Sequence, residues 1–242
     1  MAPTIPKTSV SSSAPVGRDR VGEVYQHLRD LIVRGRAAPG TRLVEAQLVE
    51  RLSTSRTSVR SAIQRLQQEG YVTPASPGRK ASPAVTALTS EDAREVFTVV
   101  AAIEGLAAER ASELSDGPRR RLVARLTETN GAYRVAGIDD SDADTLFALD
   151  TQFHRLYVEA ASGPRVLALH AAINPQIERY VRIYQTALHE AIQTSVVEHA
   201  AIVAEIASGS GRGADEAVRT NWRNAAIRLQ AVIDSRGEKG TW

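Results

Sequence analysis

Asp150 and His154 are the residues of this chain best suited to bind a metal ion. Four residues make about one turn of an α-helix, so both side chains project from the same face. Their neighbours are apolar or aromatic, among them Phe147, Leu156 and Tyr157. A carboxylate and an imidazole directed into an apolar helical bundle are typical of metal sites in helical proteins. A solvent-exposed ion pair on a helix surface is the alternative interpretation.

His199 is a further candidate ligand on a different segment. It shares a helical face with Ile202 and Ile206, so we expect its imidazole to be buried. A buried histidine either binds a metal or forms hydrogen bonds within the core. The residues themselves leave both interpretations open.

A second kind of chemistry is indicated by residues 53–72, STSRTSVRSAIQRLQQEGYV. Ser55 is placed to cap a helix, and Val59, Ile63 and Leu66 recur on one face of it. The opposite face carries arginine, threonine, serine and glutamine. A short helix with an apolar back and such a front is suited to the DNA major groove, where arginines can bind guanine edges and phosphates.

The segments before and after this helix predict two further helices and a pair of short strands. Helical spacing predicts one helix from about 18 to 36 and another from about 44 to 52. The tight connection before Ser55 then makes a helix-turn-helix. Two short strands, 71–73 and 81–85, flank a Pro-Gly-Arg-Lys tip and form a basic wing. We therefore predict a winged helix-turn-helix over residues 18–86.

The uneven distribution of charge supports this division. Residues 1–86 contain 13 Lys/Arg and 6 Asp/Glu, whereas residues 87–242 contain 17 and 22, within a net charge of +2. A basic first third attached to an acidic remainder suggests that the first third binds a polyanion. Such binding should weaken steeply with salt because counterions are released.

The remainder of the chain is predicted to be helical. Residues 1–17 are rich in serine and proline and are read as a disordered tail. Residues 88–242 show no convincing strand and form an antiparallel bundle of six to seven helices, depending on whether Pro175 ends a helix or only kinks it. The predicted fold class is therefore mainly α.

Composition excludes several kinds of protein. The chain has no cysteine, which excludes disulfides and thiolate metal sites. No run of 18 apolar residues is present, and no signal-peptide core precedes the first helix, so we expect neither membrane insertion nor export. A cytoplasmic protein is the expectation.

The first third resembles the winged helix-turn-helix of the GntR family of bacterial transcription regulators. The resemblance implies a homodimer that binds a palindromic double-stranded DNA operator. Arg56 and Arg60 are the candidates for base contacts, and Ser55, Thr57 and Arg79 for backbone contacts, with Gly78 in the wing. The matching positions are Pro39, Gly40, Leu43, Glu45, Leu48, Leu52, Ser55, Arg56, Thr57, Val59, Arg60, Leu66, Glu69, Gly70 and Gly78.

The helical remainder is similar to the FCD ligand-binding domain of the FadR/VanR branch of that family, and its length is nearer to the VanR subgroup. The FCD pattern places D-x3-H on one helix, E-H-x2-I on another and a last histidine 22 residues further on. Here Asp150, His154 and His199 match, and the last position is Asn221. The resemblance implies a divalent ion, Zn²⁺, Ni²⁺ or Mn²⁺, with open positions for the carboxylate of a small effector.

Other effector contacts are less directly indicated. Many FCD domains carry an arginine on their first helix, but Val100 occupies that position here. Arg182, with Tyr184 beside it, is a candidate replacement, and a surface arginine is the alternative. Trp222 either lines the effector pocket or packs in the core.

These residues together predict a ligand-responsive DNA-binding regulator, which we expect to be a repressor, without catalytic residues. Two alternatives stay open: a regulator whose bundle only dimerises, and a metal-dependent enzyme that uses the cluster for hydrolysis or hydration.

Overall fold

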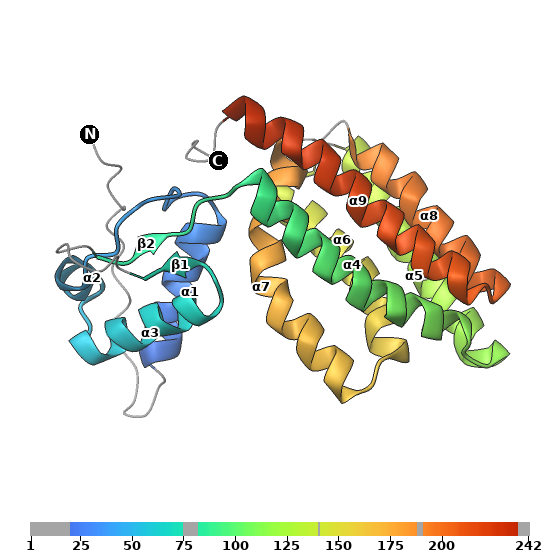
Figure 1. The fold of residues 1–242 in the computed structure, drawn as a ribbon, viewed down its shortest axis with the longest axis horizontal. Coiled ribbons are helices and arrows are strands. Elements are labelled where there is room, and N and C mark those ends of the chain that lie inside the picture. The colour runs from blue at the N-terminus through green and yellow to red at the C-terminus, as the bar shows by residue number, and fades with distance from the viewer. Residues whose placement is uncertain (1–19, 75–81, 140, 188–190, 237–242) are drawn as a thin grey trace. The chain divides into compact units, whose positions relative to one another are not determined.

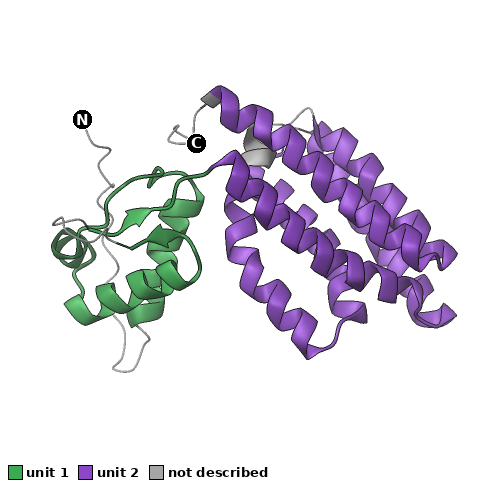
Figure 2. Cartoon of the chain, viewed as in Figure 1, with its two compact units in different colours: residues 1–88, 236–242 green, residues 89–235 purple. Residues whose placement is uncertain are grey.

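The computed structural model describes residues 20–74, 82–139, 141–187 and 191–236. They form two compact units, the first ending at Leu88 and the second running from Thr89 to Ser235 (Figure 2). The architecture is mainly α, which confirms the predicted fold class, and the described part contains a single two-stranded sheet. None of the described helices has both the length and the apolar character needed to cross a bilayer.

The first unit consists of three helices and a short hairpin. In the hairpin the strands are antiparallel, with Val72 opposite Val85 and Thr73 opposite Ala84. The predicted wing tip, which includes Gly78 and Arg79, lies outside the described residues. The elements are α1 (Arg20–Val33), α2 (Glu45–Leu52), α3 (Arg56–Gln68), β1 (Val72–Thr73) and β2 (Ala84–Val85).

Helix α3 forms where the sequence predicts it and for the predicted reasons. The Ser55 side chain accepts a hydrogen bond from the Ser58 N–H at 3.0 Å and so caps the free first turn. Val59, Ile63 and Leu66 are buried in the core of the unit against α1 and α2. This packing fixes α3 by its apolar face and turns its polar face outward.

The second unit is a bundle of long helices that lie side by side (Figure 1). Pro175 lies inside α7, which continues through it, so the described part of this unit has six helices rather than seven. They are α4 (Ser90–Ser112), α5 (Asp116–Ile138), α6 (Ala143–Ala161), α7 (Pro164–Ala187), α8 (Ile192–Ser208) and α9 (Gly211–Arg236).

Helix packing in this unit brings distant segments together. α5 packs against α6 and α8, and α4 packs against α6, α7 and α8. α9 lies along α4 (Figure 1), and the two approach closely at Gly105. A Cβ atom at this position would lie 2.1 Å from Oδ1 of Asp215. A larger residue at this position would therefore force the Asp215 side chain to move away from α4.

Candidate metal centre and DNA-binding surface

The exposed face of α3 carries the arginines predicted to read DNA. Arg56, Thr57 and Arg60 are all exposed. Arg56 makes no hydrogen bond or ion pair with any described residue. Arg60 is held by Glu45 of α2 in a two-pronged contact, Nη2 to Oε2 at 3.1 Å and Nε to Oε1 at 3.3 Å. The two arginines therefore differ: Arg56 has no partner in the described part of the chain, whereas Arg60 is oriented by a carboxylate.

Asp150 and His154 of α6 meet His199 of α8 in the interior of the bundle. One ligand atom from each residue lies within 4.8 Å of the other two. The exposed fractions are 9% for Asp150, 5% for His154 and 1% for His199. This burial excludes the solvent-exposed ion pair as an interpretation of Asp150 and His154.

His199 makes no hydrogen bond to a described residue through either ring nitrogen. Its Nε2 lies 3.7 Å from Oδ1 of Asp150, beyond hydrogen-bonding distance. The ring is stacked on Phe153 at 4.1 Å, with Tyr133 at 5.6 Å. An imidazole that is buried without partners is costly unless it binds something. The donor set of one carboxylate and two imidazoles fits a divalent ion such as Zn²⁺.

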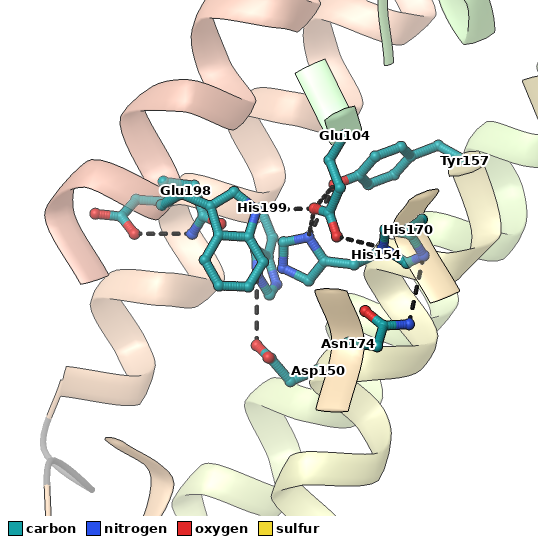
Figure 3. A network of polar contacts seen from close by, with 10 residues as sticks. Glu104, Asp150, His154, Tyr157, His170, Asn174, Glu198 and His199 are labelled. Atoms are coloured by element: carbon teal, nitrogen blue, oxygen red, sulfur yellow. Dashed lines mark hydrogen bonds and ion pairs between the residues drawn. The ribbon is translucent and has the colours of Figure 1, made fainter. Parts of the chain in front are cut away.

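Glu104 of α4 is the centre of a hydrogen-bond network beside this cluster (Figure 3). Its side chain is only 2% exposed. Oε2 lies 2.7 Å from Nδ1 of His154 and accepts from the Tyr157 hydroxyl at 2.7 Å and from the Trp222 indole N–H at 2.8 Å. Oε1 lies 2.9 Å from Nε2 of His170. One carboxylate thus joins helices α4, α6, α7 and α9.

The contact with Glu104 orients the His154 ring. A proton on Nδ1 is donated to the carboxylate, which leaves Nε2 as the nitrogen with a free lone pair. A carboxylate behind a ligating histidine fixes the ring and makes its free nitrogen more basic. In His170 the two ring nitrogens have the opposite roles, because Nε2 donates to Glu104 and Nδ1, 3.4 Å from Nδ2 of Asn174, is the acceptor.

The electrostatics of the cluster follow from burial and these charges. Burial alone would raise the pKa of Glu104, but His154 and His170 hold it well below its usual range. Burial would likewise lower the pKa of His154, but the Glu104 carboxylate raises it. Burial raises the pKa of Asp150 to about 6. Burial, with His154 nearby, lowers the pKa of His199 well below its usual range, so this imidazole is neutral and can act as a ligand.

Asn221 of α9 is buried, and its side chain forms a hydrogen bond with Glu198. Its Nδ2 donates to Oε2 of Glu198 at 3.1 Å, and Arg228 and Asn224 bind the same carboxylate. The Asn221 carbonyl oxygen is the atom left for a cation, since an amide nitrogen is not a metal ligand. Its role as a fourth ligand stays a prediction.

The three predicted effector residues, Trp222, Arg182 and Tyr184, do not share one site among the described contacts. Trp222 is 5% exposed and binds Glu104, so it belongs to the network as well as to the core. Arg182 forms ion pairs with Asp144 and Glu178, and its guanidinium lies 4.2 Å from the ring centroid of Phe147. α7 contains Tyr184, whose side chain is outside the described part of the chain.

Sequence reasoning did not identify Glu104 and His170 as members of the site. A signal for Glu104 exists, because it follows Val96 and Val100 at spacings of four and precedes Ala107 and Ala108 on the buried face of α4. A carboxylate in the middle of an apolar stripe requires partners. No comparable signal marks His170.

Two family models match the chain. The model described as bacterial regulatory proteins, gntR family, matches residues 20–78, and the FCD domain model matches residues 95–224. The chain is 29% identical over 157 residues to an HTH-type transcriptional regulator of Agrobacterium vitis encoded in the TAR-I ttuE-ttuC' intergenic region. That alignment covers 65% of this chain and 90% of the relative.

Further relatives and solved structures agree with these matches. The HTH-type transcriptional regulator YdhC of Bacillus subtilis is 24% identical, over 89% of this chain and 93% of its own. A GntR transcriptional regulator from Rhodococcus sp. RHA1 has a TM-score of 0.68 at 20% identity, covering 88% of this chain and 99% of its own. Escherichia coli McbR/YncC has a TM-score of 0.67 at 17% identity, covering 88% and 98%. At these identities the structures show a shared fold.

Proposed function

Because the chain belongs to the GntR family of bacterial regulatory proteins and carries an FCD domain, we propose that it is a dimeric repressor of a palindromic operator and that a small carboxylate bound in its helical unit changes its affinity for DNA. Members of this family bind DNA and regulate transcription. The family and the relatives described above are transcription regulators rather than enzymes. Its target being DNA, we expect it to act in the cytoplasm.

The polar face of α3 supports the DNA-binding part of the proposal. Arg56 and Arg60 are exposed above a buried apolar back, the arrangement that a recognition helix needs. We assign base contacts to these two arginines and backbone contacts to Ser55 and Thr57. The wing residues Gly78 and Arg79 are proposed to add contacts at the backbone or minor groove.

The observation that carries the sensing part is the buried imidazole of His199, which has no hydrogen-bond partner among the described residues. Asp150, His154 and His199 would hold a divalent ion, and Asn221 is a further candidate ligand. Such an ion would supply a positive centre that attracts the carboxylate of an effector. Glu104 would hold the His154 ring so that its Nε2 can bind the ion.

Metal content tests this assignment. Protein purified without chelator should contain about one divalent ion per chain by mass spectrometry of the metal. His199→Ala and the nearly isosteric Asp150→Asn should both lose it, while His27→Gln, a histidine of the first unit, should keep it. Circular dichroism would confirm that the variants are folded. Equal metal content in all four proteins would overturn the assignment.

A thermal-shift assay distinguishes an effector-sensing bundle from one that only dimerises. A panel of small carboxylates should raise the melting temperature of the metal-loaded protein, since a ligand stabilises the state that it binds. Prior treatment with chelator should abolish the shift. A bundle that only dimerises would show no shift in either case.

A further inference from the structure

The outward face of α4 carries four apolar side chains in a row, although the opposite face of this helix already contributes to the bundle core. Val99 is 42% exposed and Leu106 is 36% exposed. Ala102 between them is exposed, and Ile103 is half-buried. Spacings of three and four residues place these side chains on one face of the helix. In Figure 1, α4 lies on the near side of the second unit, between α7 and α9.

Opposite charges mark the two ends of this apolar row. Glu95 precedes Val99 by one helical turn, and Arg110 follows Leu106 by one turn. Both charged side chains are exposed, and neither forms a hydrogen bond or ion pair with a described residue. Both are therefore available to a partner chain. We call this set the α4 stripe, which consists of Glu95, Val99, Ala102, Ile103, Leu106 and Arg110.

The α4 stripe is complementary to itself when a second copy of the helix runs antiparallel to it. A twofold axis at the middle of the stripe places Glu95 opposite the partner's Arg110 and Val99 opposite the partner's Leu106. Each pair occurs twice, because a residue that contacts another across a twofold axis is contacted by it in return. Ala102 lies beside the axis, where its small side chain allows the two helices to approach closely. A different protein as partner would not require this symmetry.

We propose that the second unit dimerises through the α4 stripe, with the α4 helices of two chains packed antiparallel about its middle. The proposal rests on the dimer of the proposed function and names the surface that forms it. Apolar contacts lie at the centre, and an ion pair at each end fixes the register. The pairing stops at the ends of the stripe, because the next pair outward, Asp92 with the partner's Glu113, is acidic on both sides. Helices that cross at an angle separate at such outer positions.

Charge reversal tests the register of this pairing. In Arg110→Glu both ion pairs become pairs of carboxylates, so the dissociation constant of the dimer should rise about tenfold or more. Glu95→Arg should weaken the dimer in the same way, because it opposes two guanidinium groups. The double variant Glu95→Arg/Arg110→Glu has both pairs again and should dimerise as wild type does. Sedimentation velocity of the full-length proteins measures each constant.

A mixture of the two single variants gives an independent readout. Arg110→Glu and Glu95→Arg each place like charges opposite each other in their own homodimers, whereas a heterodimer of the two has two complementary pairs. The mixture should therefore form heterodimers more tightly than either variant forms homodimers. A double variant as weak as the single ones, together with a mixture that gains nothing, would overturn the pairing.

The apolar centre is tested with a matched control. Leu106→Glu should raise the dissociation constant of the dimer at least about tenfold, since it places a charge in the apolar contact. Val197→Glu, at a position of α8 that is 69% exposed, should leave the constant unchanged. Circular dichroism would confirm that both variants are folded. The chain has no cysteine, so Ala102→Cys introduces a single thiol beside the axis, and mild oxidation should link two chains.

The outcomes separate the stripe from the proposed function. A dimeric wild type whose dissociation constant is the same in Leu106→Glu and in Val197→Glu would place the interface elsewhere. This result overturns the α4 pairing and leaves the dimeric regulator intact. A wild type that is monomeric at micromolar concentrations would instead contradict the proposed dimer itself, and the stripe with it.

Discussion

The indole N–H of Trp222 donates to Oε2 of Glu104 at 2.8 Å, and the same oxygen lies 2.7 Å from Nδ1 of His154. A residue of α9 and a candidate metal ligand of α6 are thus joined through one buried carboxylate of α4. The position of the His154 ring therefore depends on residues that do not touch the proposed metal.

Glu104→Gln should weaken metal binding by about 10- to 100-fold, the usual effect of losing a carboxylate that supports a ligating histidine. The amide keeps the size of the side chain but removes the charge that orients the His154 proton. Competition with a chromophoric chelator measures the change. Glu95→Gln, an exposed glutamate of the same helix, is the control and should bind metal as wild type does. Equal affinities for the two variants would show that Glu104 does not support the site.

Trp222→Phe should lower the free energy of unfolding by about 1.5–3 kcal/mol, since it removes one hydrogen bond to a buried charge while keeping an aromatic ring. Urea denaturation with chelator present measures this loss. In the Glu104→Gln background, Trp222→Phe should lower the free energy of unfolding by less, because the negative charge that accepts the indole hydrogen bond is absent. Purely additive losses would mean that the Trp222–Glu104 bond contributes little.

Acid should destabilise the metal-free protein partly through His199. Burial lowers the pKa of His199 in the folded state below its ordinary value of 6.5, so the unfolded state binds more protons below that pH. The free energy of unfolding therefore keeps the full contribution of neutral His199 above pH 6.5. This contribution declines as the pH falls below 6.5, by up to about 1.4 kcal/mol per pH unit for one proton. His199→Phe removes this proton uptake and should show a shallower decline from pH 7 to pH 5. Parallel curves of unfolding free energy for the two proteins would contradict this prediction.

Arg60→Ala should cost about 1–3 kcal/mol of discrimination between operator and unrelated DNA, the expected value of a two-pronged base contact. Fluorescence anisotropy with both DNA fragments, at a stated salt concentration, gives the ratio. Arg120→Ala, on α5 of the second unit, should leave the ratio unchanged. A variant that keeps the wild-type ratio would place base recognition elsewhere than at Arg60.

Glu45→Gln should raise the affinity for unrelated DNA a few-fold, because it removes a negative charge beside the proposed DNA-binding face of α3. The same change should lower the preference for the operator, since Arg60 loses the contact that orients it. The two effects are separated by measuring each DNA at several salt concentrations. An unchanged affinity for both DNAs would show that the Glu45–Arg60 pair has no part in recognition.

The helical periodicity predicted much of the fold because it reflects interactions between near neighbours. Ser55 caps α3 as predicted, and Val59, Ile63 and Leu66 are buried as predicted. Pro175 was ambiguous, because the surrounding packing decides whether a helix continues through a proline.

Only part of the candidate metal site can be predicted from the sequence. The spacing of Asp150 and His154 is local, so the sequence could place both on one face. Glu104 lies 50 residues from His154, 66 from His170 and 118 from Trp222 in the chain. Contacts across such separations depend on how helices pack, which no local pattern encodes.

Trp222 has neighbours on two sides: its indole N–H donates to Glu104, and the residue also lines a small pocket between α4 and α9 together with Phe97 and Arg94. If a compound in the pocket alters the Trp222–Glu104 bond, it changes the affinity of the histidine cluster for an ion. Thermodynamic reciprocity then requires the ion to change the affinity of the pocket by the same factor. A single indole ring would in this way let the regulator combine two chemical signals before it responds.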